Sequence, residues 1–256
     1  MSTPRREDVL RTTDTSLRLI EHIAELDGAR LGELAAETGH AKSTVHDHLR
    51  TLAAHGYVVR EGDTYHVGLI LSQYGEYARK RRGVYKTAKS VVSELAAETQ
   101  MGADFTVEEN GRIVSVYDET GYSDTPSFFV DSRLFQVHSS ASGKAILAEY
   151  PEHRVREIVD QWGLPTQTDN TITSMDGLFA ELKRVREQGY GTNIEEAIEG
   201  LWAIGMAVKR PNGEVCGSLN AVGPTYIYDE TREAELADLL REKVTTFERQ
   251  LVEQRD

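Results

Sequence analysis

The segment 38–52, TGHAKSTVHDHLRTL, carries many hydrogen-bonding side chains on a short helical pattern. Val45, Leu49 and Leu52 repeat at i, i+4 and i+7, which predicts one buried face. The polar side chains that then face outward are Lys42, Ser43, Thr44, His46, Asp47 and Arg50. Ser and Thr can bond a base edge or a phosphate, Arg reads guanine, and Asp accepts from cytosine N4. This chemistry suits DNA contact, and the simpler interpretation is a solvated amphipathic helix.

Metal-ligand chemistry is not expected from this helix or from the rest of the chain. His46 and His48 stand two positions apart, so on a helix they point in different directions. The single cysteine, Cys216, excludes both an internal disulfide and a Cys-based zinc cluster. We expect neither a metal nor a cofactor.

A second polar group, around residues 138–144, could be imagined as catalytic. His138 with Ser139, Ser140 or Ser142 offers a base and a nucleophile, which keeps a hydrolytic enzyme as an alternative function. No G-x-S-x-G elbow is present, and neighbours on one turn rarely align for proton transfer. The run Ser142-Gly143-Lys144 lacks the upstream glycine of a P-loop. The simpler interpretation is a turn into a helix whose free N–H groups could bind an anion.

The elements that would position the first group read as a small DNA-binding domain. Apolar spacing predicts helices over 12–26 and 31–39, and Gly39 then leaves a tight turn before the helix at 41–51. The alternating segment 56–68, GYVVREGDTYHVG, predicts a hairpin that turns at Gly62. Helix, helix-turn-helix and hairpin in this order indicate a winged helix.

A helical connector follows over 68–82 and ends in the basic run Arg79-Lys80-Arg81-Arg82. This run either contacts phosphate or complements the helix C-terminus, and the sequence leaves both readings open. Gly83 marks a break before another helix over 84–99.

The remaining chain predicts an α+β domain. Strands at 103–109 and 112–119 flank Asn110-Gly111, a strong hairpin signal, and 128–137 reads as a further strand. Helices are expected from 142, at 152–162 and from Ser174, followed by a second hairpin over 201–223 and a long helix from Asp229. Strands interleaved with helices around two antiparallel hairpins favour the α+β class.

Charge is distributed unevenly along the 256 residues, whose net charge is −13. Residues 1–82 hold 12 Lys/Arg and 12 Asp/Glu, whereas residues 83–256 hold 17 and 30. A domain boundary near 82 is expected. The acidic, Lys-poor surface suggests a halophile, with an ordinary acidic protein as the alternative. No secretory signal or run of about 20 apolar residues is visible, so a cytoplasmic protein is expected.

Four stretches make the chain resemble the IclR family of transcriptional regulators. They are AKSTVHDHLRTLAAHGYV, YHVGLILSQYG, VHSSASGKAILA and GYGTNIEEAIEGLWAIGMAVKRPNGEVCGSLNAVGP. The resemblance implies a winged helix-turn-helix domain (1–67), a linker helix (68–83) and a GAF-like mixed α/β effector domain (84–256). It further implies a dimer or dimer of dimers on a pseudo-palindromic DNA operator, with Arg60 of the wing as a further contact.

The resemblance also implies where a small-molecule effector binds. The implied residues are His138, Ser140, Ser142, Gly143, Asn193, Leu201, Ala203, Asn220 and Val222, with Leu134 and Trp202 as further apolar walls. The chemistry suits a small polar metabolite, such as an organic or sugar-derived acid. A neutral sugar or an aromatic acid remains open.

Three departures limit what the resemblance transfers. Asp47 stands where the family often has Arg, Asn193 where some members have an acid, and Ala203 where a small polar residue or Cys is common. The operator, the effector, the target genes, the sign of regulation and the choice between dimer and tetramer stay open. An enzyme, or a protein-interaction module that binds no DNA, is the competing class.

Overall fold

The computed structural model describes residues 9–120 and 136–253, and the chain divides into two compact units, Met1–Arg81 and Arg82–Asp256. Residues 128–135 of one predicted strand, with Leu134, lie outside the described residues. The described end of that segment, Gln136, pairs with Arg112 in an isolated antiparallel bridge.

The first unit packs α1, α2 and α3 against a three-stranded antiparallel sheet in the order β1-β3-β2, and it ends in a fourth helix, α4. Its elements are α1 (Arg11–Glu25), β1 (Ala29–Arg30), α2 (Leu31–Thr38), α3 (Lys42–Ala54), β2 (Val58–Glu61), β3 (Thr64–Val67) and α4 (Ile70–Lys80). Leu19, Leu34, Val45 and Leu49 are all fully buried in one cluster. The helical pattern at 41–52 and the hairpin at 56–68 are thereby confirmed.

Glycines end the elements of this unit where the backbone turns left-handed. Gly39 follows α2 with φ of 68°, and Gly62 opens the β2–β3 turn with φ of 62°. An L side chain rarely adopts such angles, so glycine fits both positions. The strand β1 was not predicted, because two residues are too short to show alternation.

The second unit is built on a five-stranded antiparallel sheet in the order β5-β4-β8-β7-β6. Its elements are α5 (Val84–Thr99), β4 (Gly102–Glu109), β5 (Arg112–Glu119), α6 (Ala141–Ala148), α7 (Glu152–Trp162), α8 (Met175–Gln188), β6 (Gly191–Ile194), β7 (Leu201–Lys209), β8 (Val215–Pro224), a 3-10 turn (Thr225–Ile227) and α9 (Glu230–Glu253). Both predicted hairpins are confirmed. Asn110 and Gly111 have φ of 54° and 78°, as a tight hairpin turn requires.

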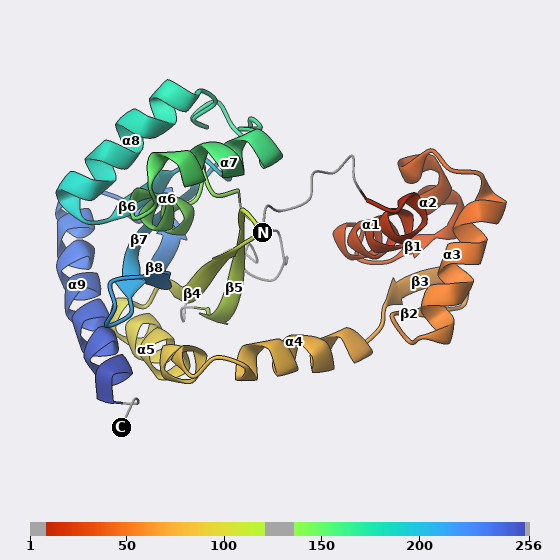
Figure 1. Cartoon of the computed structure of the whole chain (residues 1–256), viewed down its shortest axis with the longest axis horizontal. Helices are drawn as coiled ribbons and strands as arrows, with labels where there is room; N and C mark the ends of the chain where they lie inside the picture. Colours follow the sequence, from red (N-terminus) through yellow and green to blue (C-terminus); the bar gives the residue numbers. More distant parts are fainter. Residues whose placement is uncertain (1–8, 121–135, 254–256) are drawn as a thin grey trace. The chain divides into compact units, whose positions relative to one another are not determined.

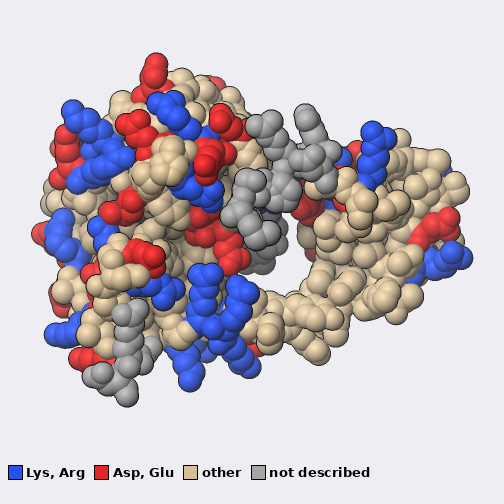
Figure 2. Space-filling model, viewed as in Figure 1, with Lys and Arg blue, Asp and Glu red and all other residues tan. Residues whose placement is uncertain are grey.

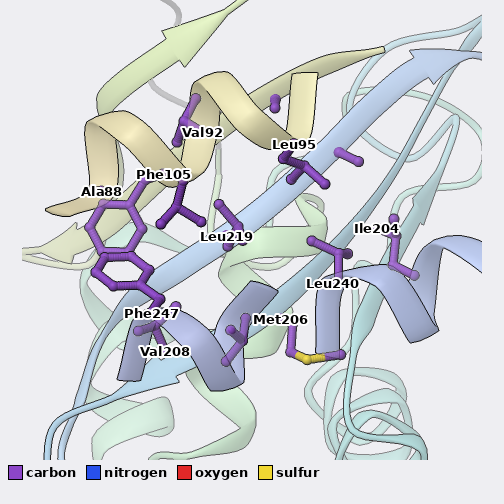
Figure 3. Close-up of a cluster of buried hydrophobic side chains, with 14 of the residues drawn as sticks. Ala88, Val92, Leu95, Phe105, Ile204, Met206, Val208, Leu219, Leu240 and Phe247 are labelled. Carbon is purple, nitrogen blue, oxygen red and sulfur yellow. The ribbon is translucent and has the colours of Figure 1, made fainter. Parts of the chain in front are cut away.

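Helices cover both faces of this sheet (Figure 1). On one face α5 and α9 pack against alternate residues of β4, β8 and β7, so that Phe105, Leu219 and Ile204 join Val92 and Phe247 in a single core (Figure 3). On the other face α6 lies across the sheet, and α7 and α8 pack outside it. The alternation of the strands therefore assigns their remaining residues to the α6 face.

Candidate nucleic-acid interface and ligand site

The outward face of α3 is as polar as its sequence predicts. Val45, Leu49 and Leu52 are buried against α1 and α2. All six candidate contact residues are exposed, namely Lys42, Ser43, Thr44, His46, Asp47 and Arg50. The helix begins after Ala41 without a side-chain cap, so its first N–H groups also point to solvent.

Asp47 and Arg50 form an ion pair on this face, with Nη2 of Arg50 3.5 Å from Oδ1 of Asp47. Both side chains are largely exposed, so the pair contributes little to stability. Its consequence is electrostatic, since the carboxylate offsets the one guanidinium among the six candidates. Arg50 must leave or share this partner to reach a base.

His48 belongs to the structure of the domain and not to its outer face. Its Nδ1 lies 2.8 Å from Oγ of Ser16, which ties α3 to α1. His46 is exposed, so the two imidazoles point in different directions. No group of three or more metal-ligating side chains occurs within residues 9–120 and 136–253.

Arg60 is held within the wing. Its Nε donates to the carbonyl oxygen of Gly62 at 2.9 Å, and its Nη2 donates to Oδ1 of Asp63 at 3.2 Å. The guanidinium also lies over the ring of Tyr65, 5.7 Å from its centroid. Arg60 therefore fixes the turn of the hairpin, and DNA contact by its remaining N–H groups stays a prediction.

Four candidate ligand residues lie together on the α6 face of the sheet. Asn193, Ala203 and Val222 are register partners on β6, β7 and β8. Leu201 lies two residues before Ala203, and the apolar members cluster with Ala141 of α6. The predicted apolar wall is thus partly assembled. Trp202 points to the opposite face, into the α5–α9 core, which corrects its prediction as a wall residue.

The start of α6 packs very closely on this wall. A Cβ at Gly205 of β7 would lie 3.0 Å from the backbone nitrogen of Ser142 and 2.3 Å from Oδ1 of Asn220. A Cβ at Gly191 of β6 would lie 2.5 Å from the carbonyl oxygen of Ala141. Two glycines on neighbouring strands, themselves in register, therefore admit the helix.

The N-terminus of α6 offers fewer free donors than the sequence indicates. Oγ of Ser140 caps the helix, accepting the N–H of Gly143 at 3.1 Å and donating to the carbonyl oxygen of Gln136 at 2.9 Å. The N–H of Gly143 is therefore not available to an anion, which corrects that expectation. Ser142 is the remaining candidate donor of the pair.

Asn193 and Asn220 differ in which of their side-chain amide atoms already make hydrogen bonds. Oδ1 of Asn193 accepts the N–H groups of Glu196 and Ala197, at 2.8 and 3.4 Å, and so shapes the turn after β6. Within the described parts of the chain, its Nδ2 makes no hydrogen bond. Asn220 keeps neither end free. Its Oδ1 accepts from Ser218 at 2.7 Å, and its Nδ2 donates to Thr106 and to Asp104.

Asp104 is a residue that sequence reasoning missed. It lies on β4 opposite Asn220 of β8, and its carboxyl accepts a short hydrogen bond from that amide. Burial raises the pKa of Asp104 to about 7, the hydrogen bond from Asn220 lowers it, and the charge of Asp118 on β5 raises it. An acid that titrates near neutrality thus lies beside the predicted ligand residues.

The predicted effector residue His138 and its neighbour Ser139 are both bonded to the loop between α7 and α8. Nε2 of His138 lies 3.1 Å from the carbonyl oxygen of Pro165, and the ring is fully buried. Burial lowers the pKa of His138, so its neutral form is favoured. Ser139 bonds to Gln167 in the same loop. These side chains anchor the segment before α6 to the α7–α8 connection, and they form no nucleophile–base pair.

A buried ion network lies behind the wall. Lys144 is fully buried, and its Nζ pairs with Glu196 and, at 3.2 Å, with Glu181. Arg184 adds a second bond to Glu181 at 2.8 Å and reaches Oγ1 of Thr192 at 2.9 Å. The network neutralises its own charges and ties α6 to α8 and to the turn after β6. Apart from a lysine inside an apolar helix, no sequence pattern indicates this network.

Family models match both units of the chain. One described as the IclR helix-turn-helix domain matches residues 12–62, and one described as the C-terminal domain of bacterial transcriptional regulator IclR matches residues 77–249. The chain belongs to the IclR family.

Similar proteins span nearly the whole chain. The probable HTH-type transcriptional regulator ArcR of Halobacterium salinarum is 30% identical over 250 residues, which cover 96% of this chain and 94% of that protein. The transcriptional repressor IclR of Escherichia coli is 25% identical, covering 88% and 84%. The crystal structure of an IclR transcriptional regulator from Alicyclobacillus acidocaldarius superposes with a TM-score of 0.78 at 23% identity, covering 95% and 99%.

Membership in the IclR family fixes the class of protein. The chain is a DNA-binding transcriptional regulator with a C-terminal effector domain, and it is not an enzyme. The resemblance and the α+β class are both confirmed. Within residues 9–120 and 136–253, no helix is long and apolar enough to cross a membrane.

Proposed function

We propose that the protein binds a pseudo-palindromic operator through α3 and releases or engages it in response to a small polar metabolite. The observation that carries the DNA side is the outward face of α3, where six exposed polar side chains stand over a fully apolar buried face. A helix that only needed to be solvated would require no such mixture of base-reading groups.

The proposed assembly is a homodimer or a dimer of dimers. The first unit exposes large apolar side chains on α1 and α4, with Leu17 56% and Tyr74 54% exposed. A pocket of about 650 Å³ between α1, α3 and α4 has Leu17, Ile20 and Tyr74 in its lining. We propose that a second copy of the chain covers these apolar side chains. A two-fold dimer formed in this way would present two α3 helices to half-sites spaced by about one helical turn or a multiple of it.

The proposed effector is an organic or sugar-derived acid. Support comes from the apolar wall of Leu201, Ala203 and Val222 and from the polar groups at its edge, Nδ2 of Asn193 and the start of α6 at Ser142. The charge of Asp104 would affect which effectors bind, because an ionised carboxylate beside the wall would repel an acidic ligand. We therefore expect the affinity for an acidic effector to fall as the pH rises through about 7.

The DNA assignment is tested by binding of the purified protein to the DNA upstream of its own coding region. Thr44→Ala, His46→Ala and Arg50→Ala are compared with Arg18→Ala, an exposed arginine on α1. We expect weaker binding for the α3 variants and unchanged binding for the control. Unchanged affinity in all three α3 variants would remove α3 from the interface.

The effector assignment is tested by a thermal-shift screen of central and sugar-acid metabolites on the wild type. Hits are repeated on Asn193→Ala and Val222→Phe, which alter the wall from two strands. Full affinity in both variants would place the effector elsewhere. The same screen includes neutral sugars and aromatic acids, which decides among the effector classes left open above.

The proposed setting is the cytoplasm of a halophile. The acidic excess of the chain and the 30% identity to a Halobacterium salinarum regulator support it. Growth of the source organism across a range of salt concentrations, with the internal KCl measured, tests this setting directly.

A further inference from the structure

A pocket of the effector domain lies at the opposite end of the sheet from the predicted effector wall. Its volume is about 820 Å³. The lining comprises Arg82, Val107, Glu108, Ile146, Glu149, Tyr150, Arg210, Asn212, Gly213, Glu214, Val215, Cys216 and Gly217. None of these is a predicted effector residue. The pocket adjoins the C-terminal end of α6, whereas the wall adjoins its N-terminal end, and eight helical residues span about 12 Å.

Two arginines enter this pocket from separate elements. Arg82 is the first residue of the second unit, two positions before α5 begins at Val84, and Arg210 follows β7 at the hairpin turn. Neither guanidinium has a hydrogen bond or ion pair with any described residue. Burial raises the pKa of the Cys216 thiol to about 11, the charges of Arg210 and Arg82 lower it, and the carboxylate of Glu248 raises it. Basic side chains are prominent where α4 ends and α5 begins (Figure 2).

Two acids of the pocket are already neutralised by protein groups. Glu149 pairs with Lys209, whose Nζ lies 2.8 Å from its carboxylate. Glu108 accepts from the hydroxyl of Tyr150 at 2.8 Å and lies 3.4 Å from Nη2 of Arg154. Glu214 stands on the turn with an exposed side chain. Among the described residues, the two arginines and the exposed Glu214 are thus the charged side chains of this lining for which no ion pair is formed.

The remaining lining fits an organic anion. The lining also includes the apolar side chains of Val107 and Ile146 and, at the hairpin turn, Asn212 and Gly213. The turn at Gly213 has open space around its Cα, with no atom within 4 Å of the position that a Cβ would take. Arginine is the side chain best matched to carboxylate and phosphate oxygens, which it can bind in a bidentate manner.

We propose that this pocket is a second ligand site of the regulator, which binds a small organic anion with carboxylate or phosphate groups between Arg82 and Arg210. The site is separate from the effector wall and does not depend on the effector proposed above. A ligand there would give the effector domain a second regulatory signal, bound in part by Arg82, which lies two positions before α5.

The proposal is tested by titrating inorganic phosphate, succinate and a sugar phosphate into the full-length protein, with KCl adjusted to hold ionic strength constant. Isothermal calorimetry compares the wild type with Arg82→Gln, Arg210→Gln and the control Arg241→Gln, an exposed arginine on α9. We expect saturable binding that weakens about tenfold in each pocket variant and not in the control. A preference for phosphate probes or for succinate identifies the anionic group.

Cys216, the one cysteine of the chain, lines the pocket and reports where the anion sits. Its reaction with a thiol reagent should slow when the anion binds the wild type, and this protection should be lost in Arg210→Gln. Binding that the double variant Arg82→Gln/Arg210→Gln retains in full, or the absence of saturable binding by all three probes, would overturn the proposal. Because both arginines lack protein partners among the described residues, their replacement should leave the fold intact, which circular dichroism checks.

Discussion

At the scale of single residues, charge on α3 would decide how the proposed interface reads DNA. The pairing of Asp47 with Arg50 would place a negative charge in an interface where phosphate attraction usually dominates affinity. An interface with such a carboxylate would depend more on contacts to the DNA bases. Asp47 repels the phosphates of any DNA sequence, but it can accept a hydrogen bond from a cytosine.

Replacement of Asp47 by Ala should therefore tighten binding to unrelated DNA while it relaxes discrimination. Loss of the carboxylate frees Arg50 for phosphate, whereas a cytosine contact is lost. We expect discrimination at one operator position to drop by about 1–3 kcal/mol. Competition binding with an operator and with a scrambled duplex measures both effects. A change of equal size on the two duplexes would mean that Asp47 reads no base.

Arg50→Ala should act in the opposite direction. The loss of a guanine contact is expected to cost about 1–3 kcal/mol on the operator and little on the scrambled duplex. Lys42→Ala, which removes a charge from the first turn of the same helix, serves as the comparison. If Arg50→Ala weakens both duplexes equally, the residue binds phosphate and not a base.

Asp104 makes the stability of the effector domain depend on pH. Its pKa is raised from an ordinary value of 3.8 to about 7 in the folded chain. Between these values the folded state binds the proton more tightly than the unfolded state, so this residue's contribution to stability falls as the pH rises through the window. Asp104→Asn removes the titration and keeps an oxygen for Asn220.

The Asp104→Asn variant should therefore unfold at a higher temperature than the wild type above pH 7, with the difference vanishing toward pH 4. Melting curves from pH 4 to 9 measure this. Asp118→Asn, which removes the neighbouring charge, should give a smaller change of the same sign. Parallel pH profiles for wild type and Asp104→Asn would show that Asp104 is ionised throughout.

At the scale of elements, the first turn of α6 packs directly against the backbone of the sheet. Gly191 and Gly205 are register partners, and each stands beneath the first turn of the helix. The contact is backbone against backbone, so it transmits small shifts of the helix to the strands that carry the apolar wall.

Gly205→Ala should destabilise the effector domain by about 1–3 kcal/mol, the usual range for an overfilled core. Its Cβ would meet Oδ1 of Asn220 at 2.3 Å and backbone atoms of α6 at 3.0 Å. Gly75→Ala in α4, where no atom lies within 4 Å, is the matched control and should be neutral or stabilising. Chemical denaturation checks both, and equal stability of Gly205→Ala and wild type would show that α6 is loosely held.

At the scale of the whole molecule, the two units differ in net charge. The net charge of −13 resides after residue 82, while the first 82 residues are balanced. Self-repulsion among like charges destabilises a compact domain unless salt screens it, and at about 1 M salt the Debye length is only about 3 Å.

The effector domain should therefore lose its fold when KCl is removed, and operator binding should show a shallow slope of log K against log salt. If α3 is the interface, its own acid would leave few phosphates neutralised and few counterions released. Circular dichroism and binding across about 0.1–3 M KCl measure the two effects. A stable fold in dilute buffer, together with a steep slope, would point to an ordinary acidic protein and a phosphate-driven interface.

The sequence by itself determined those features that local spacing controls. The period of Val45, Leu49 and Leu52 determined the buried face of α3, and Asn110-Gly111 determined the β4–β5 turn through its positive φ angles. The order of helices and hairpins was enough for the α+β class and for the winged helix. The strand β6 left no signal, because four residues are too few to show a period.

Only the tertiary structure decided which side chains are free to bind. Asp104 and Asn220 are separated by 116 positions, and only strand pairing brings the acid to the Nδ2 of the amide. The partners of Lys144 and the two arginines of the proposed anion pocket likewise come from distant elements. Sequence spacing identifies groups that can form hydrogen bonds, but whether they are already satisfied depends on contacts that close only when the chain folds.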